Sequence, residues 1–282
     1  MKIRTLSVPV VAAAITLFVS GCSNCCLFNN SKTVFDCKFD NGTERAKVVI
    51  TKAPGKVKLD GVIDPKEWKG SVAYPMSQAF IYRNEKTIPA KYFANMNRKD
   101  NIVDPFEGGT VRLMYDKENL YVAAELKDTD VMQYGTEDQA HLYLTGDTLE
   151  MFLKPANSPK YWECYGTPNG KKTSLFFDTR GYPRHNDRSV LMPGIKNAVK
   201  IQGTINNFND KDKGWTIEVV IPKKELDKTG CEFKPGVPWT ILISRYNYNY
   251  GSKEGGAQFA TVPELPVVNY HLLEYYADLV WK

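Results

Sequence analysis

The sequence predicts an all-β fold, a single β-sandwich of antiparallel sheets in the jelly-roll or immunoglobulin-like class with a few short helical turns. Short apolar segments recur along the chain, and turn residues separate them. Aromatic residues make up 12% of the chain, with 16 tyrosines among them, and such residues favour strands. No internal repeat and no periodicity of a long helix stands out in the sequence.

The N-terminus is expected to be a targeting signal. Lys2 and Arg4 precede an apolar segment at 6–19, which is short for a membrane-spanning helix. Val19-Ser20-Gly21-Cys22 follows and resembles the lipobox of bacterial lipoproteins. The resemblance implies cleavage after residue 21 and a lipid on Cys22, which would place the protein in the cell envelope, periplasmic or surface-exposed. A simple secretory signal and a retained anchor helix are the alternatives.

Residues 22–45 are polar and mixed, and we interpret them as a tether to a domain at 46–282. The net charge of +5 falls to +3 without the two basic residues of the signal, which is too small to indicate a nucleic-acid partner. Of the six cysteines, two lie in the domain and none forms the paired CxxC motifs of a zinc site. Disulfides are compatible with the envelope, but their pairing is left open.

Strands are predicted wherever apolar residues alternate or cluster between turn signals. The region 72–109 is irregular and is expected to form a long insertion beside a site or over a sheet edge. Asp116–Asn119 would form the turn of a hairpin. The expected strands are 46–50, 110–116, 119–126, two within Thr145–Lys172, 172–178, 199–204, 215–221, 239–245 and 277–281, with one helical turn at 223–226.

The two strands within Thr145–Lys172 are predicted to carry the site. In the first, Leu149, Met151 and Leu153 alternate with Glu150, so the apolar residues would be buried and Glu150 would lie on the other face. In the second, Tyr161, Glu163 and Tyr165 share one face. Together the strands would present acids and rings on one open sheet surface. Rings stack on the C–H faces of a sugar, and carboxylates accept its hydroxyl protons. An ordinary solvated sheet face is the alternative.

The order of several motifs resembles the family 9 carbohydrate-binding modules. These motifs are LDGVIDPKEW, VRLMYDKENLYVAAELKDTDV, GDTLEMFLKP, YWECYGTPNGKK, GWTIEVVIPKKEL, WTILISRYNY and YHLLEYYADLVW, and they span roughly residues 50–282. The resemblance implies a β-sandwich that binds plant-type polysaccharides or their chain ends, often beside glycoside hydrolases, with structural calcium in some members. It also implies that Glu150 is the strand carboxylate of the family.

The other positions of the family pattern match to different degrees. Arg245 matches the arginine that ends the penultimate core strand, and Tyr165 falls where some members use a polar or basic contact. The family's first stacking tryptophan corresponds to Leu144, next to Tyr143, and its second falls in 259–263, where there is none. The two-tryptophan clamp is therefore absent from this sequence.

We therefore predict non-catalytic binding of a poly- or oligosaccharide at the cell envelope, aiding carbohydrate capture or catabolism, with glycoside hydrolases as possible partners and no nucleic acid. The expected sugar-binding residues are Glu150, Tyr161, Glu163, Tyr165, Tyr143 and Arg245.

Two alternative functions stay open, together with a structural ion. Glu150 and Glu163 could be the acid pair of a glycoside hydrolase. Met114, Met132 and Met151 could be axial ligands in a haem b-binding sandwich. No resident cofactor is predicted beyond a possible structural calcium, for which Asp128 and Asp130 are the candidates, although turn capping also explains them. Three widely separated histidines give no support to a triad or a zinc site.

Overall fold

A computed structural model describes residues 44–79, 106–181, 191–249, 257–266 and 268–282. The predicted signal peptide, Cys22 and nearly all of the predicted tether lie outside these residues, as does most of the insertion expected at 72–109. Within the described part of the chain, no helix has both the length and the apolar character needed to cross a bilayer.

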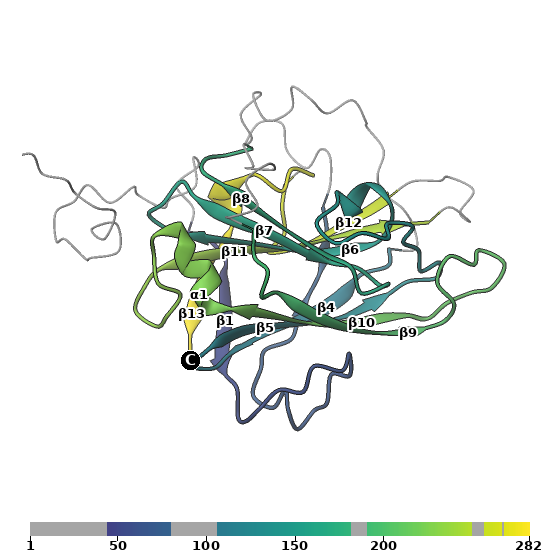
Figure 1. Ribbon diagram of the computed structural model, residues 1–282, viewed down its shortest axis with the longest axis horizontal. Helices are drawn as coiled ribbons and strands as arrows, with labels where there is room; N and C mark the ends of the chain where they lie inside the picture. The colour runs from purple at the N-terminus through teal and green to yellow at the C-terminus, as the bar shows by residue number, and fades with distance from the viewer. Residues whose placement is uncertain (1–43, 80–105, 182–190, 250–256, 267) are drawn as a thin grey trace, which may run out of the picture.

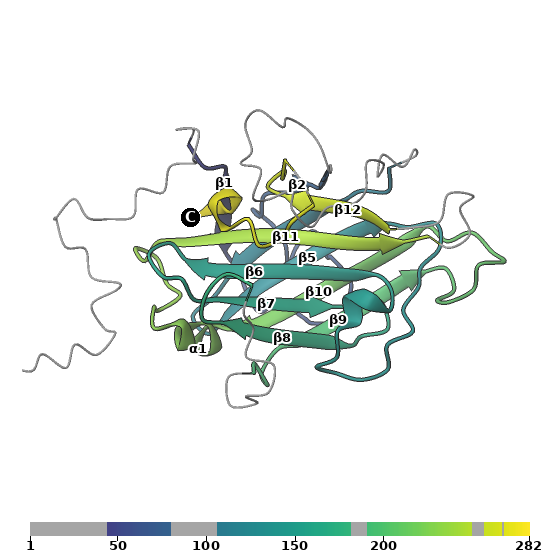
Figure 2. The same ribbon diagram turned by 90° about the horizontal axis from the view of Figure 1, so that it is seen from above.

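The strands form two facing layers, which confirms the predicted sandwich (Figures 1 and 2). We call the upper layer of Figure 1 sheet A and the lower layer sheet B. Sheet A has the order β8 (Lys172–Phe177), β7 (Tyr161–Gly166), β6 (Thr148–Pro155), β11 (Trp239–Tyr248) and β13 (Ala277–Trp281). Sheet B has the order β1 (Lys47–Lys52), β4 (Gly109–Tyr115), β5 (Asn119–Lys127), β10 (Gly214–Pro222) and β9 (Lys196–Gln202).

β1 joins the two sheets at one side, because it pairs in parallel with β13 and then with β4. The remaining pairs along this path are antiparallel. Short strands extend the edges, with β12 (Ala257–Val262) on β11, β3 (Ser77–Gln78) on β12 and β2 (Tyr74–Pro75) on β4. The helical elements are α1 (Lys223–Leu226), η3 (Leu142–Leu144), η5 (Asp227–Thr229) and η6 (Leu273–Tyr275).

Alternation along the strands decides what is buried between the sheets. Leu149, Met151 and Leu153 point into the main core, as predicted, and Trp162 of β7 joins them. The hairpin of β4 and β5, the strands β6, β7, β8 and β10, and the turn of α1 all fall within a few residues of the predicted ranges. β11 is buried on both faces from Trp239 to Arg245, which confirms its predicted central position.

Other parts of the sequence prediction differ from the structure. β9 begins at Lys196, three residues before the predicted strand. β12 was not predicted, because glycine and charge surround AQFATV and the segment shows no clean alternation. β2 and β3 are two-residue strands inside the region predicted to be irregular, and pairs this short leave no pattern in a sequence.

The outer face of sheet B is covered by the segment that contains LDGVIDPKEW. Trp68 is buried there, and its indole N–H donates to Oε1 of Glu218 on β10 at 2.9 Å. Oε2 of Glu218 accepts from the backbone N–H groups of Asp60 at 3.1 Å and Gly61 at 3.0 Å. One buried carboxylate thus fixes this segment to the sheet, and Trp68 has a structural role there.

The cysteines of the domain differ in state. Cys164 on β7 is a buried free thiol. Cys231, between η5 and β11, is buried and disulfide-bonded. The other four cysteines of the sequence lie at positions 22–37, outside the described residues.

Candidate functional site

Two carboxyl groups lie on the outer face of sheet A, as the alternation predicted. Glu150 of β6 stands opposite Tyr165 of β7, and Glu163 of β7 stands opposite Phe152, the next residue of β6 on the same face. Ser244 of β11 flanks Glu150 on the other side and donates from Oγ to Oε2 at 3.0 Å. The sheet register therefore brings the two acids onto neighbouring strands, one diagonal step apart.

Both acids are almost completely removed from solvent, and this determines their protonation. Burial raises the pKa of Glu150 to about 8, although the hydrogen bond from Ser244 opposes the shift. Burial, and secondarily the charge of Glu150, raises the pKa of Glu163 well above its ordinary value. Two carboxylates close together in an apolar setting do not ionise together at neutral pH, so the pair retains a proton there.

Tyrosine rings surround this acid pair. Tyr143 of η3 packs edge-on against Tyr165, with ring centroids 6.2 Å apart, and lies 5.5 Å from the ring of Tyr246 on β11. Tyr248 stacks on Tyr246 at 6.2 Å and donates from its hydroxyl to the carbonyl of Tyr143 at 2.6 Å. Tyr143, Tyr246 and Tyr248 are half-buried, so they form the accessible edge of the cluster.

One polar atom of the cluster lacks a partner. The hydroxyl of Tyr165 is buried and, among the described residues, makes no hydrogen bond. Burial and then the nearby Glu163 and Glu150 raise the pKa of Tyr165, so the hydroxyl keeps its proton. An unpaired buried hydroxyl beside two acids costs free energy, and a polar guest that bonded to it would recover that cost.

Tyr161 lies further along the same face, in an aromatic group of its own. Its ring stacks on Phe177 at 4.4 Å, and its hydroxyl lies 2.8 Å from Nδ1 of His271. Burial lowers the pKa of His271 to about 4, with a further contribution from Arg180, so the imidazole is neutral. These contacts bury Tyr161 completely, so its ring has a packing role.

The prediction that these residues lie on an open surface is wrong, because all four of them are buried. Glu150 and Glu163 are 2% and 5% exposed, and Tyr161 and Tyr165 have no exposed surface. A second apolar cluster covers them, to which the chain near η6 contributes Tyr270, Leu273 and Tyr276. The alternation of two strands gives the face on which a residue lies, but it contains no information about what a distant segment lays over that face.

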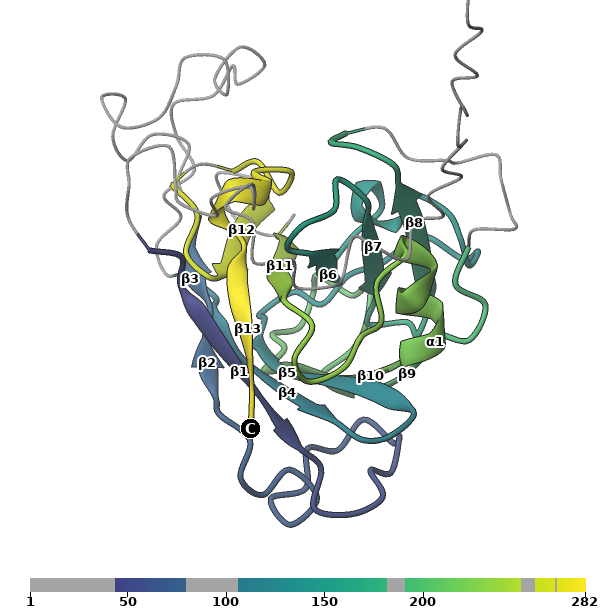
Figure 3. The ribbon, with the colours of Figure 1, turned by 90° about the vertical axis from the view of Figure 1, so that its left-hand side faces the viewer.

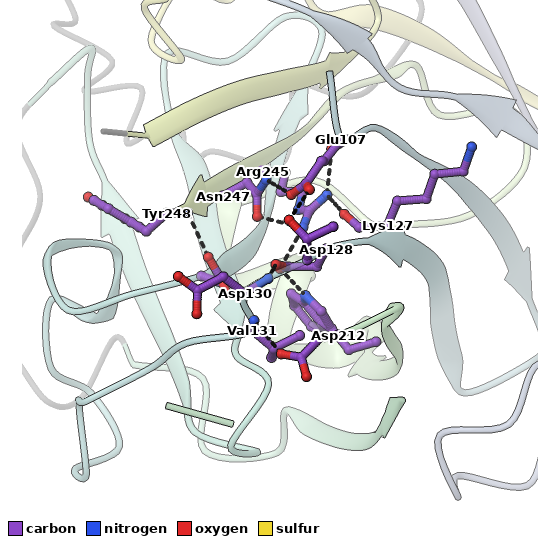
Figure 4. A network of polar contacts seen from close by, with 12 residues as sticks. Glu107, Lys127, Asp128, Asp130, Val131, Asp212, Arg245, Asn247 and Tyr248 are labelled. Atoms are coloured by element: carbon purple, nitrogen blue, oxygen red, sulfur yellow. Dashed lines mark hydrogen bonds and ion pairs between the residues drawn. The ribbon is translucent and has the colours of Figure 1, made fainter. Parts of the chain in front are cut away.

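The expectation that Arg245 lies beside the acids is also wrong. Arg245 pairs with Leu149 across β6 and β11, so it points between the sheets, away from Glu150. It is fully buried, and its Nη2 donates to Asp128 and Asn247 at 2.8 Å each. Its Nη1 donates to the carbonyls of Glu107 and Lys127, both at 2.7 Å (Figure 4).

The candidate calcium residues belong to this buried network. Oδ2 of Asp128 accepts from Arg245, and Oδ1 accepts from the backbone N–H of Asp130 at 3.0 Å, which is the turn-capping role (Figure 4). Burial raises the pKa of Asp128, and Arg245 opposes the shift. Among the described residues, no three Asp, Glu, His or Cys side chains form a group that could hold a metal ion. Arg245 supplies the positive charge here.

The methionines considered for haem do not converge. Met151 lies in the main core between the sheets, and Met114 lies on the outer face of sheet B with Trp68. Met132 is buried in the loop between β5 and β6. The structure gives these side chains packing roles in separate places.

The sequence analysis missed Tyr246, Tyr248 and Ser244, which complete the cluster around Glu150. They alternate along β11 with Arg245 and Asn247, and both faces of that strand are filled with apolar and polar residues alike. The WTILISRYNYNY segment therefore has no pattern that tells which set faces which side. Pairing of β11 with β6 supplies that information, and a single strand does not carry it.

Comparison with known proteins identifies the family and the fold of the chain. A family model described as "Carbohydrate family 9 binding domain-like" matches residues 77–236, which is 160 of the 282 residues. No curated protein matches the chain significantly.

Two solved structures share the fold. A protein from Bacteroides uniformis ATCC 8492, named as a candidate carbohydrate-binding protein, has a TM-score of 0.56 at 11% identity and covers 85% of this chain and 100% of its own. A family 9 carbohydrate binding module from Caldicellulosiruptor kristjanssonii, in complex with cellotriose, has a TM-score of 0.50 at 14% identity and covers 84% of this chain and 93% of its own. At these identities the likeness concerns the fold.

Proposed function

The chain belongs to the carbohydrate family 9 binding domain-like family, and from that premise we propose that it binds a poly- or oligosaccharide on the outer face of sheet A without altering it. The observation that carries the proposal is the acid pair Glu150 and Glu163, buried in a tyrosine cluster whose Tyr165 hydroxyl is unpaired. A sugar ring has apolar C–H faces and hydroxyl groups that both donate and accept, so it suits this mixture.

Each group of the cluster has a part in the proposal. Tyr143 and Tyr246 offer ring faces at the half-buried edge, where a pyranose ring would stack. Glu150, Glu163 and the Tyr165 hydroxyl are covered in the unbound protein, so they supply hydrogen bonds to a sugar only after the half-buried tyrosines move aside. A sugar hydroxyl that donates to a buried carboxylate stabilises the ionised form, so binding is expected to lower the pKa of Glu150 from its value of about 8.

Tyr143 takes the position beside the missing family tryptophan. The neighbouring Leu144 is 65% exposed and has no ring to stack, whereas Tyr143 contacts both Tyr165 and Tyr246. Tyrosine rings offer less contact area than two indoles, so we expect weaker binding than a two-tryptophan clamp would give.

The envelope location completes the proposal. The lipobox that ends at Cys22 supports a lipid-anchored protein, and an anchored binding module would hold glycans close to the cell for capture or catabolism. Glycoside hydrolases of the same envelope would be its partners. Radiolabelled palmitate on the native chain and its loss in Cys22→Ser test the anchor separately from sugar binding.

Calorimetric titration with cello-oligosaccharides, followed by a glycan array for other sugars, tests the binding. Glu150→Leu keeps the bulk of the side chain and removes both oxygens, and the loss of a hydrogen bond to a charged group is expected to weaken binding about tenfold or more. Tyr143→Ala removes a ring platform and is expected to weaken binding several-fold.

Glu125→Gln is the matched control, because Glu125 is exposed on β5 of the other sheet. Equal affinities in all three variants, or no binding of any glycan by the folded protein, would exclude this site. Release of reducing sugar that Glu150→Gln abolishes would instead favour the glycoside hydrolase alternative.

A further inference from the structure

The two ends of the sandwich differ in surface charge. We call the end that carries α1, the β4–β5 turn and the final residues of β1 and β13 the α1 pole; it faces the viewer in Figure 3. We call the opposite end, which carries η3, the η3 pole. At the α1 pole the exposed charged residues are Lys52, Lys56, Lys117, Lys196, Lys224, Lys228, Lys234 and Lys282, against Glu118 and Glu232. Two of these lysines form ion pairs, Lys228 with the buried Glu225 and Lys234 with Glu232, and the other lysines still leave a positive excess.

The η3 pole has no such excess. Among the described residues its exposed charged side chains are Lys127, Lys211 and Lys213, against Glu137, Asp138 and Asp210. The protein therefore carries its surplus of positive charge at one end. Such an asymmetric distribution orients a molecule in the field of a charged surface, even where the net charge of the whole chain is small.

The lysines of the α1 pole surround a hollow of about 510 Å³ between the β4–β5 turn, α1 and the chain that leads to β11. Lys117, Lys224 and Lys234 are on its rim. On this rim Lys117 pairs with Glu118 at 3.8 Å and Lys234 pairs with Glu232, but in both pairs the side chains are more than half exposed, so the pairs neutralise little of the local field. The pole is thus open to an anionic partner.

We propose that the α1 pole is the membrane-facing surface of the domain and contacts the anionic head groups of a lipid bilayer. The lysines supply attraction of about fivefold in affinity each at low salt. The η3 pole, with Tyr143, then points away from the bilayer, which leaves the edge of the candidate sugar site open to glycans. The orientation relies on the lipid anchor under the proposed function; the lysine surface does not.

Vesicle sedimentation of the mature chain with Cys22→Ser, purified oxidised, tests the surface without the lipid. Vesicles that contain phosphatidylglycerol are compared with vesicles of phosphatidylcholine alone. Replacing Lys52, Lys117 and Lys224 with Gln is expected to lower the partition coefficient on anionic vesicles about a hundredfold. Replacing Lys127, Lys211 and Lys213 with Gln removes the same charge from the η3 pole and is expected to leave partitioning nearly unchanged.

Binding that favours anionic vesicles, weakens with salt and is lost only in the α1-pole variant supports the proposal. Equal loss in both variants, no binding to anionic vesicles, or retention on a sulfated polysaccharide in place of vesicles would overturn it. Sugar titration of the same variants is expected to be unchanged, which separates this proposal from the proposed function.

Discussion

The acid pair on sheet A predicts an unusual dependence of stability on pH, and Glu150→Gln is the substitution that reveals it. The amide has the shape of the protonated acid and still accepts a hydrogen bond from Ser244, which lies 3.0 Å from the carboxyl oxygen. The substitution therefore removes the ability to ionise and leaves the packing nearly unchanged. We expect it to stabilise the protein at alkaline pH.

The sign and the size follow from the pKa of Glu150, which burial raises from the ordinary 4.5 to about 8. Below pH 4.5 the carboxyl is protonated in both the folded and the unfolded chain, so it contributes no pH dependence. Between pH 4.5 and 8 the unfolded chain releases the proton and the folded chain keeps it, so the free energy of unfolding falls as the pH rises. At about 1.4 kcal/mol per pKa unit, the loss is at most about 5 kcal/mol above pH 8.

Urea unfolding of the native protein and of Glu150→Gln between pH 5 and pH 9 measures this effect. The two free energies of unfolding should be close at pH 5 and should diverge in favour of the variant by several kcal/mol at pH 9. Glu125→Gln, on the exposed face of β5, should follow the native protein at every pH. A variant that is less stable than the native protein at pH 9, or that keeps the full pH slope, would refute a protonated, buried Glu150.

Three further predictions concern the packing that positions the site. Glu218→Ala leaves the Trp68 indole and two backbone N–H groups without an acceptor, and chemical denaturation should show a loss of about 3 kcal/mol or more; a loss below 1 kcal/mol would contradict the clamp. Arg245→Met leaves Asp128 buried without its cation, which should cost about 3–5 kcal/mol, and unchanged stability would show that the network does not need the charge. Gly214 has φ +136°, and an added Cβ would lie 2.0 Å from a carbonyl oxygen of β5. Gly214→Ala should therefore lower the melting temperature by several degrees. An unchanged melting temperature would show that β5 and β10 can move apart at this position.

How far the sequence predicts this protein depends on whether a feature is local to one strand. Glu150 and Glu163 lie on the predicted face because alternation with Leu149 and Trp162 is a property of each strand alone. Arg245 was expected at the site from its match to the family pattern; β11 has no polar side, and only its pairing with β6 fixes which residues point inward.

The sequence did not predict that the site is buried, and the reason is related. The residues that cover Tyr165 and Glu163 come from η3 and from the chain near η6, which are more than 100 positions apart. Contacts over such separations arise from the packing of loops against a finished sheet, and no short pattern encodes them. The clamp of Trp68 by Glu218, 150 positions apart, is a second case.

The central claim is that glycans bind at the tyrosine and acid cluster of sheet A, and a crystal structure of the protein with cellotriose tests it most directly. We predict a sugar ring against Tyr143 with a hydroxyl group within hydrogen-bonding distance of Glu150. A sugar bound at the α1 pole or on sheet B, with the cluster unchanged, would contradict the account.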